Sequence, residues 1–165
     1  MDTDMKTNES NDHAESTGTD TDMSTYDPGT DRQAIIDLTI NYCWTIDSKD
    51  FENLRTIFLP EATALLGDER DGIESIIERI RGALGPLDAS QHIISNHQIN
   101  VTGDEATGRC YLHAQHVRRG AEGGPNYIVA GRYLDRYVRT PDGWRIIRRE
   151  IAVDWTDGNI RVARP

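Results

Sequence analysis

The apolar residues of this chain follow one spacing in its first half and another in its second half. Up to about residue 85 they recur at intervals of three and four, which is typical of helices that bury one face. From about residue 91 they alternate with polar residues, as in strands with one buried face. The spacing predicts helices at residues 31–47, 50–58 and 72–84, a short strand at 62–66, and long strands at 91–101, 106–118, 126–139 and 144–155.

The order of these elements predicts the fold class. Helices come first and are followed by a meander of long strands, joined by turn signals such as Pro141-Asp142-Gly143, which is typical of an α+β domain. Long strands with few breaks favour a strongly curved antiparallel sheet wrapped around the N-terminal helices. We therefore expect a cone-shaped barrel whose interior is the place for a ligand.

Composition divides the chain into three parts. Residues 1–30 are almost entirely polar or acidic, so they cannot bury enough apolar surface to offset the entropy lost on folding. We expect a disordered acidic tail there, one folded domain at residues 31–156, and a loose C-terminal tail at residues 157–165. The first residues also lack the apolar stretch of a signal peptide, so we expect a cytoplasmic protein.

Charge and cysteine content exclude several classes of function. Most of the net charge of −10 belongs to the acidic tail, and arginine pairs such as Arg148-Arg149 do not form the basic stripe that nucleic acids require. No apolar run approaches the ~20 residues of a membrane span. Cys43 and Cys110 lack metal or redox spacing, and no phosphate-binding loop is present. We expect no nucleic-acid partner, no membrane partner, no metal and no cofactor.

Asp47 and His92 are the residues best suited to proton transfer. Asp47 closes the first helix and His92 lies on the first long strand. An imidazole oriented by a carboxylate works as a general base near neutral pH. Each residue has a structural alternative, because Asp47 is able to cap the second helix and His92 is able to be a core histidine. A carboxylate at the negative end of a helix nevertheless favours a cationic or protic partner, such as an imidazole.

Three motifs resemble the SnoaL-like branch of the nuclear transport factor 2-like superfamily. They are Tyr42-x4-Asp47 at the end of the first helix, His92-x3-Asn96 on the first long strand, and Gly143-Trp144-x3-Arg148 on the last strand. The resemblance covers about residues 31–156. Within that branch the chain is similar to scytalone dehydratase, bile-acid dehydratases and the hexachlorocyclohexane dehydrochlorinase. In those enzymes the matching Asp and His form a catalytic dyad in which the His removes a proton.

The resemblance also implies roles for other residues. Tyr42 and Arg148 assist at the substrate, although Tyr42 is equally suited to core packing, and His116 holds a water or leaving group. Strand alternation places Arg148 on the inner face, sends Arg149 to solvent, and lets His97 pack outside the cone. The expected catalytic residues are His92, Asp47, Tyr42 and Arg148, and the expected substrate-binding residues are His116, Asn96, Leu112, Ala114, Tyr133, Trp144 and Ala152.

These expectations describe a cofactor-independent lyase of the dehydratase type. His92, oriented by Asp47, abstracts a proton next to a carbonyl of a small hydrophobic substrate, and water is lost. The same residues serve a polyketide or terpenoid cyclase or an isomerase equally well. A third alternative is a non-catalytic dimeric binding or scaffold protein, because the outer face of the last strand is apolar. We expect a homodimer or homotrimer, and the distance between Asp47 and His92 distinguishes enzyme from scaffold.

Overall fold

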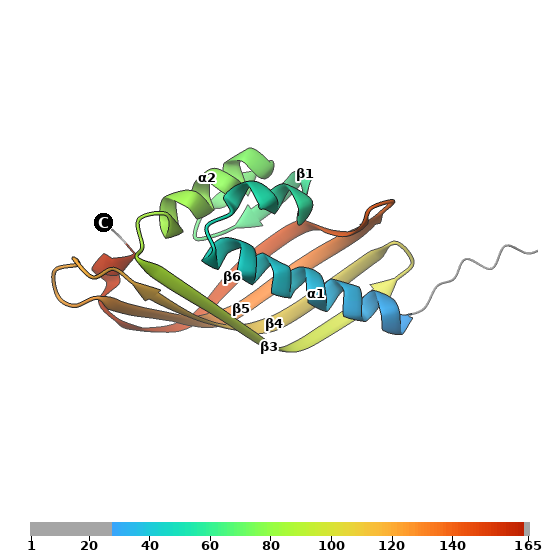
Figure 1. The fold of residues 1–165 in the computed structure, drawn as a ribbon. Coiled ribbons are helices and arrows are strands. Elements are labelled where there is room, and N and C mark those ends of the chain that lie inside the picture. Colours follow the sequence, from blue (N-terminus) through green and yellow to red (C-terminus); the bar gives the residue numbers. More distant parts are fainter. Residues whose placement is uncertain (1–27, 164–165) are drawn as a thin grey trace, which may run out of the picture.

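The computed structural model describes residues 28–163, and its elements follow the predicted order (Figure 1). Of the tail predicted for residues 1–30, residues 1–27 lie outside the described residues, whereas residues 28–30 are helical. The elements are α1 (Pro28–Asp47), the 3-10 helix η1 (Phe51–Thr56), β1 (Phe58–Leu65), β2 (Glu69–Asp71), α2 (Ile73–Leu84), β3 (Ala89–Thr102), β4 (Glu105–Val117), β5 (Asn126–Thr140), β6 (Gly143–Gly158) and the 3-10 helix η2 (Ile160–Val162).

The six strands form one curved, unclosed sheet in the order β2-β1-β6-β5-β4-β3. All neighbouring strands are antiparallel except β1 and β6, which are parallel. α1 lies along the inner face of the sheet, where it contacts β3 and β6, and α2 packs over β1 and η1 (Figure 1). The α+β class and the wrapping of a curved antiparallel sheet around N-terminal helices are thereby confirmed.

Some local predictions need correction. The helix predicted at residues 50–58 is the short η1, because the chain already enters β1 at Phe58 and pairs there with β6. The loose C-terminal tail predicted from residue 157 is wrong for residues 157–163. Val162 of η2 is 1% exposed, and the side chain of Asn159 donates hydrogen bonds to the carbonyls of Glu122 and Gly124. This segment is therefore fastened to the loop between β4 and β5.

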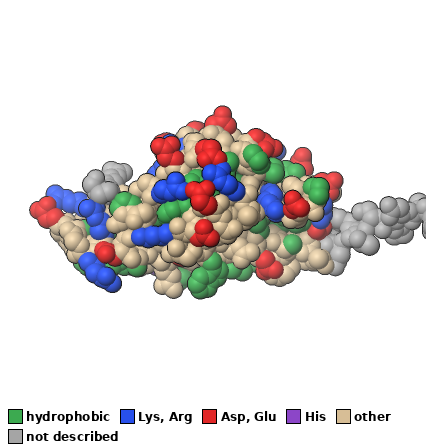
Figure 2. Space-filling model, turned by 45° about the horizontal axis from the view of Figure 1, so that its top comes forward, with side chains coloured by type: hydrophobic (Ala, Val, Ile, Leu, Met, Phe, Trp, Pro, Cys, Tyr) green, Lys and Arg blue, Asp and Glu red, His purple; other side chains and the backbone are tan. Residues whose placement is uncertain are grey.

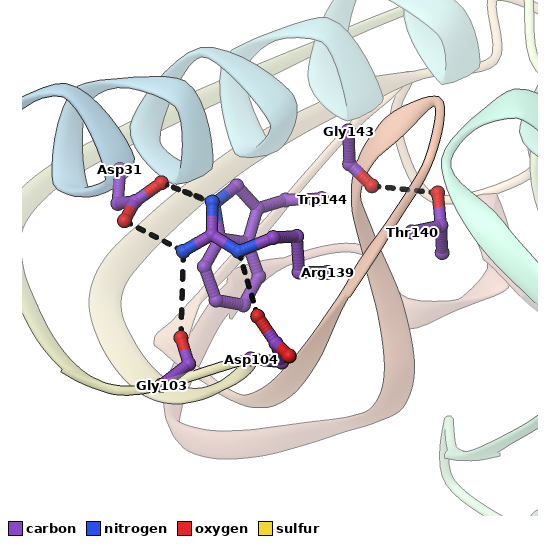
Figure 3. A network of polar contacts seen from close by, with 7 residues as sticks. All are labelled: Asp31, Gly103, Asp104, Arg139, Thr140, Gly143 and Trp144. Carbon is purple, nitrogen blue, oxygen red and sulfur yellow. Dashed lines mark hydrogen bonds and ion pairs between the residues drawn. The ribbon is translucent and has the colours of Figure 1, made fainter. Parts of the chain in front are cut away.

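The first turn of α1 is fastened to the sheet through Asp31 (Figure 3). Arg139 donates to the two carboxylate oxygens of Asp31 at 2.5 and 2.7 Å, and the indole N–H of Trp144 donates to Oδ1 at 3.0 Å. The Arg139 guanidinium also lies 4.4 Å from the Trp144 ring centroid and donates to Asp104. The hydrogen bonds from Arg139 lower the pKa of the Asp31 carboxyl although its burial works in the opposite direction.

Acidic and basic side chains are interspersed on the face shown in Figure 2. Over η1 and α2, Arg55 pairs with Glu52 and Glu74, and Arg81 pairs with Glu52. Exposed pairs of this kind contribute about 0–1 kcal/mol each. Within residues 28–163, no helix is both long and apolar enough to cross a membrane.

Candidate active site

Asp47 and His92 meet where α1 ends beside β3. Nδ1 of His92 lies 2.6 Å from Oδ1 of Asp47. The backbone N–H of His92 donates to Oδ2 at 2.8 Å, and the hydroxyl of Ser90 donates to Oδ1 at 2.7 Å. Only 6% of the His92 side chain and 17% of the Asp47 side chain are exposed. The predicted pair is therefore in hydrogen-bond contact, and the residue at the N-cap of η1 is Asp50 rather than Asp47.

The turn after α1 holds the two residues in this arrangement. Lys49 adopts a left-handed backbone conformation with φ of 61°, which turns the chain sharply after Asp47. Its ammonium group donates to the carbonyls of Leu87 and Gly85 at 2.5 and 3.1 Å. Leu87 and Gly85 belong to the connection that leads into β3, so the end of α1 is tied to the start of the strand that carries His92.

The carboxylate determines which ring nitrogen of His92 carries the hydrogen. An ionised carboxylate only accepts hydrogen bonds, so Nδ1 of the neutral ring is the donor and Nε2 keeps its lone pair. Nε2 has no hydrogen-bond partner among residues 28–163. Burial opposes the ionisation of Asp47, but the hydrogen bonds from His92 and Ser90 outweigh it and lower the pKa of the carboxyl. The arrangement is that of a base and its orienting group.

The inner face of β4 places His116 beside this pair. The ring centroids of His116 and His92 are 5.6 Å apart, with the planes at 82°. His116 is buried, and its Nδ1 has no hydrogen-bond partner within the described part of the chain. Burial, reinforced by the nearby His92, lowers the pKa of His116 to about 4. His116 is therefore a neutral imidazole at physiological pH, on the inner face of β4.

A groove of about 620 Å³ opens beside the dyad, between α1 and β3. Its wall on α1 is apolar and includes Trp44, whose side chain is unusually exposed at 73%. A substrate-sized space with an apolar wall and a few polar groups is typical of small-molecule sites. The residues that line the groove include Ile40, Cys43, Trp44, Asp47, Ser90 and His92.

Arg148 and Arg149 exchange the orientations that strand alternation predicts. A bulge at Ile147 shifts the register between β5 and β6, and this offsets the alternation by one residue. Arg149 therefore points inward and is 0% exposed, whereas Arg148 lies outside and pairs with Glu69. The predicted inward orientation of Arg148 and the predicted exposure of Arg149 are both wrong.

Bulges displace three further residues. Asn96, with φ of 57°, sits at the register shift of β3 and is exposed, away from the groove of the dyad. The shift turns His97 inward, where its Nε2 lies 3.1 Å from the hydroxyl of Thr39, so the prediction that His97 packs outside is wrong. Ala152 follows the bulge in β6, and its neighbour Ile151 packs against the core instead. Neither Asn96 nor Ala152 lies where it would contact a substrate bound at His92.

The other predicted lining residues belong to the core. Tyr42 and Tyr133 are nearly completely buried and their rings pack edge to face at 5.7 Å. Leu112 and Ala114 are buried in the same cluster, and Trp144 lies at the opposite end of α1 from Asp47. These five residues do not line the groove at His92, so the sequence prediction placed the cavity too deep inside the cone.

Ser90 is a site residue that the sequence analysis missed. Its hydroxyl bonds the Asp47 carboxylate, and alternation puts residues 90 and 92 on the same face of β3. A hydroxyl two residues before an inward histidine is the signal that identifies it. No cluster of three or more potential metal ligands occurs in residues 28–163.

Comparisons with known proteins agree with this architecture. Residues 29–150 match the SnoaL-like domain, and this chain therefore belongs to the SnoaL-like family. An uncharacterised protein of Mycobacterium tuberculosis is 33% identical over 123 residues, which cover 72% of this chain and 82% of that protein.

A solved structure from Salmonella enterica named as a nuclear transport factor 2-like superfamily protein superposes with a TM-score of 0.70 at 23% identity, covering 76% of this chain and 92% of that chain, which shows likeness of fold. A protein of Kribbella flavida superposes with a TM-score of 0.78 at 27% identity, covering 84% of this chain and 100% of that chain. A protein from Novosphingobium aromaticivorans named as a candidate scytalone dehydratase gives 0.72 at 25% identity, covering 79% and 88%. A hexachlorocyclohexane dehydrochlorinase gives 0.70 at 19% identity, covering 79% and 89%, which shows likeness of fold alone. The fold is thus shared with proteins whose names are those of small-molecule-converting enzymes.

Proposed function

We propose that this protein is a cofactor-independent lyase of the dehydratase type, in which His92 is the general base and Asp47 orients it. The observation that carries the proposal is the 2.6 Å contact between Nδ1 of His92 and Oδ1 of Asp47, beside an open groove. The contact fixes the ring so that the lone pair of Nε2 is available to a substrate proton. A hydrogen-bonded acid and imidazole beside an open groove favour an enzyme over a non-catalytic scaffold.

The reaction follows from the position of the base. Nε2 of His92 takes the proton from the carbon next to a substrate carbonyl, and the electron pair of that C–H bond forms an enolate. The enolate collapses to a carbon–carbon double bond as the bond to the β-hydroxyl breaks. The imidazolium returns its proton to the departing hydroxide, which leaves as water, and the Asp47 carboxylate stabilises the imidazolium in between.

The residues around His92 differ from those that the sequence predicts to assist the reaction. Tyr42 and Arg148, which the resemblance assigns to the substrate, do not line the groove. His116 is the neutral imidazole that packs against His92, but it is buried and is not among the residues that line the groove, so its role is to pack against the base. A substrate with a planar apolar part fits the groove, because Trp44 exposes its ring there.

The proposal is tested with His92→Ala and Asp47→Asn on a panel of β-hydroxy ketones, including polyketide-like and steroid compounds. Loss of a general base lowers the rate by about 10²–10⁴-fold. His113→Ala is the matched control, because His113 is an exposed histidine on the neighbouring strand β4 that contacts Trp155 on the outer face. Retention of the wild-type rate by both dyad variants on a compound that the wild type converts would exclude the dyad.

Mass spectrometry of the product distinguishes the reaction types. Dehydration removes the mass of one water, whereas a cyclase or an isomerase working through the same enolate leaves the mass unchanged. If either product depends on His92, proton abstraction by His92 is supported. A product of unchanged mass means that the protein is a cyclase or an isomerase and not a lyase.

A further inference from the structure

The outer face of the sheet carries a cluster of arginines on three adjacent strands. Arg109 is on β4, Arg136 on β5 and Arg148 on β6, and the register places Arg136 directly opposite Arg148. Arg109 is one row away, opposite Leu134. Like charges directly opposite each other on neighbouring strands are destabilising. The cluster therefore calls for a compensating negative charge.

The described residues supply only part of that charge. Arg148 pairs with Glu69 at 3.0 Å, but Arg109 donates to the uncharged amide of Gln98. Arg136 is exposed and has no hydrogen-bond or ion-pair partner within residues 28–163. The three arginines line a groove of about 720 Å³, whose acidic lining residues are the half-buried Glu150 and the buried Asp135, which is paired with Arg149. This groove has an excess of positive charge, and it is separate from the groove at His92.

We propose that the acidic N-terminal segment, residues 1–27, docks in this arginine groove of its own chain. The segment contains eight acidic residues and one lysine. It ends where α1 begins at Pro28, and Arg32, one turn into α1, lines the rim of the groove and donates to the backbone carbonyl of His97. The segment thus enters the described fold beside a groove in which several arginines complement its charge.

Length and tethering make the docking feasible. Four neighbouring strands span about 15 Å at ~4.8 Å per step. A dozen residues in extended conformation reach about 40 Å at roughly 3.3 Å each, so the segment is long enough to cross the groove. A short tether gives an effective concentration in the millimolar range, and individually weak ion pairs are then sufficient for occupancy.

The test uses the full-length chain with a spin label attached through Ser10→Cys. The native Cys43 and Cys110 are buried and do not compete for the label. At low salt, paramagnetic broadening of amide signals is expected around residues 107–109, 134–136 and 148–150, and not around residues 73–84 of α2. The broadening disappears at about 1 M salt, where the screening length falls to about 3 Å.

Variants identify the binding surface. Arg109→Gln combined with Arg136→Gln abolishes the local broadening, and so does replacement of the eight acids by their amides. Arg119→Gln combined with Arg161→Gln removes two exposed arginines elsewhere and leaves the broadening in place. The proposal is overturned if the broadening is absent in the wild type at low salt, or if it survives in the Arg109 and Arg136 variant.

A mixing experiment separates docking within one chain from docking between two chains. Spin-labelled chain without isotope is mixed with isotope-labelled chain without spin label. Docking in cis predicts no broadening at residues 134–136 in the mixture, and broadening there would overturn it in favour of a second copy.

Discussion

Arg149 and Asp135 form a two-point ion pair in the centre of the molecule. Nε and Nη2 of the guanidinium lie 2.8 and 2.7 Å from the two carboxylate oxygens, and the side chains are 0% and 1% exposed. The rings of Tyr42 and Tyr133 cover the guanidinium, with centroids 4.0 and 4.2 Å from its Cζ. The hydroxyl of Tyr137 donates to the same carboxylate at 2.8 Å. The core is thus built around a charge that only these partners make tolerable.

Removing one partner of this pair is expected to destabilise the fold strongly. Arg149→Gln leaves a buried carboxylate without its counter-charge, and breaking a buried pair in this way costs about 3–5 kcal/mol. The free energy of unfolding from urea titrations measures the loss. Arg132→Gln is the control, because it breaks the exposed pair with Asp154 and costs at most about 1 kcal/mol. Equal losses in the two variants would contradict the role assigned to Arg149.

The arginines also show where sequence reasoning stops. Alternation along β6 correctly predicts that Trp144 and Ile146 face inward. It then gives the wrong orientation for Arg148 and Arg149. An extra residue at Ile147 reverses the assignments from Arg148 to Val153, until a second register shift at Asp154 restores them, yet no Gly or Pro marks the first shift. A bulge is selected by pairing with β5 and β1, which are distant in sequence, so a local pattern cannot reveal it.

The dyad was predictable for the opposite reason. Asp47 is fixed by the end of a helix and His92 by a strand segment before any bulge, so their relative placement depends only on element order and alternation. Ser90 follows from the same alternation. The groove wall is different, because it depends on how far α1 leaves β3 uncovered. That spacing is set by packing of the whole sheet, so the sequence pattern alone does not predict it.

Two glycines are expected to respond to alanine in opposite directions. A Cβ at Gly131 would lie 2.2 Å from the backbone carbonyl oxygen of Ala152, so Gly131→Ala forces two strands apart and costs roughly 1–3 kcal/mol. Gly82 lies within α2 and a Cβ there meets nothing within 4 Å, so Gly82→Ala stabilises by about 0.5–1 kcal/mol through helix propensity. The midpoint of thermal unfolding is expected to fall below that of the wild type in Gly131→Ala and to rise above it in Gly82→Ala, and thermal denaturation measures both.

Burial of His116 predicts a loss of stability in mild acid. The imidazole binds a proton near pH 6.5 in the unfolded chain but only near a pKa of about 4 in the fold. The unfolded state therefore holds more protons between these values, and stability present above pH 6.5 declines as the pH falls towards 4, by about 3 kcal/mol at most. Urea midpoints at pH 7 and pH 5 measure the decline.

His116→Phe removes this titration and is expected to flatten the pH dependence between 6.5 and 4. His113→Phe changes an exposed histidine three positions earlier on the opposite face of β4, and should leave the slope as it is in the wild type. A slope that stays unchanged in His116→Phe would mean that His116 is protonated in the fold at higher pH than its burial implies.

The tautomer of His92 offers a test of the dyad that needs no substrate. The Asp47 carboxylate accepts from Nδ1, so long-range nitrogen–proton correlation spectra should show Nδ1 protonated and Nε2 bare in the neutral ring. Asp47→Asn offers an amide N–H in place of one acceptor oxygen, and this N–H is able to donate to Nδ1 and drive the hydrogen to Nε2. A ring with its hydrogen on Nε2 has no lone pair facing the substrate, which is how an almost isosteric change removes the base. Ser90→Ala keeps the carboxylate and is expected to keep the wild-type tautomer while raising the pKa of Asp47, because one of the hydrogen bonds that lower it is lost. If the wild-type spectrum shows Nε2 protonated instead, His92 cannot act as the base in the geometry described.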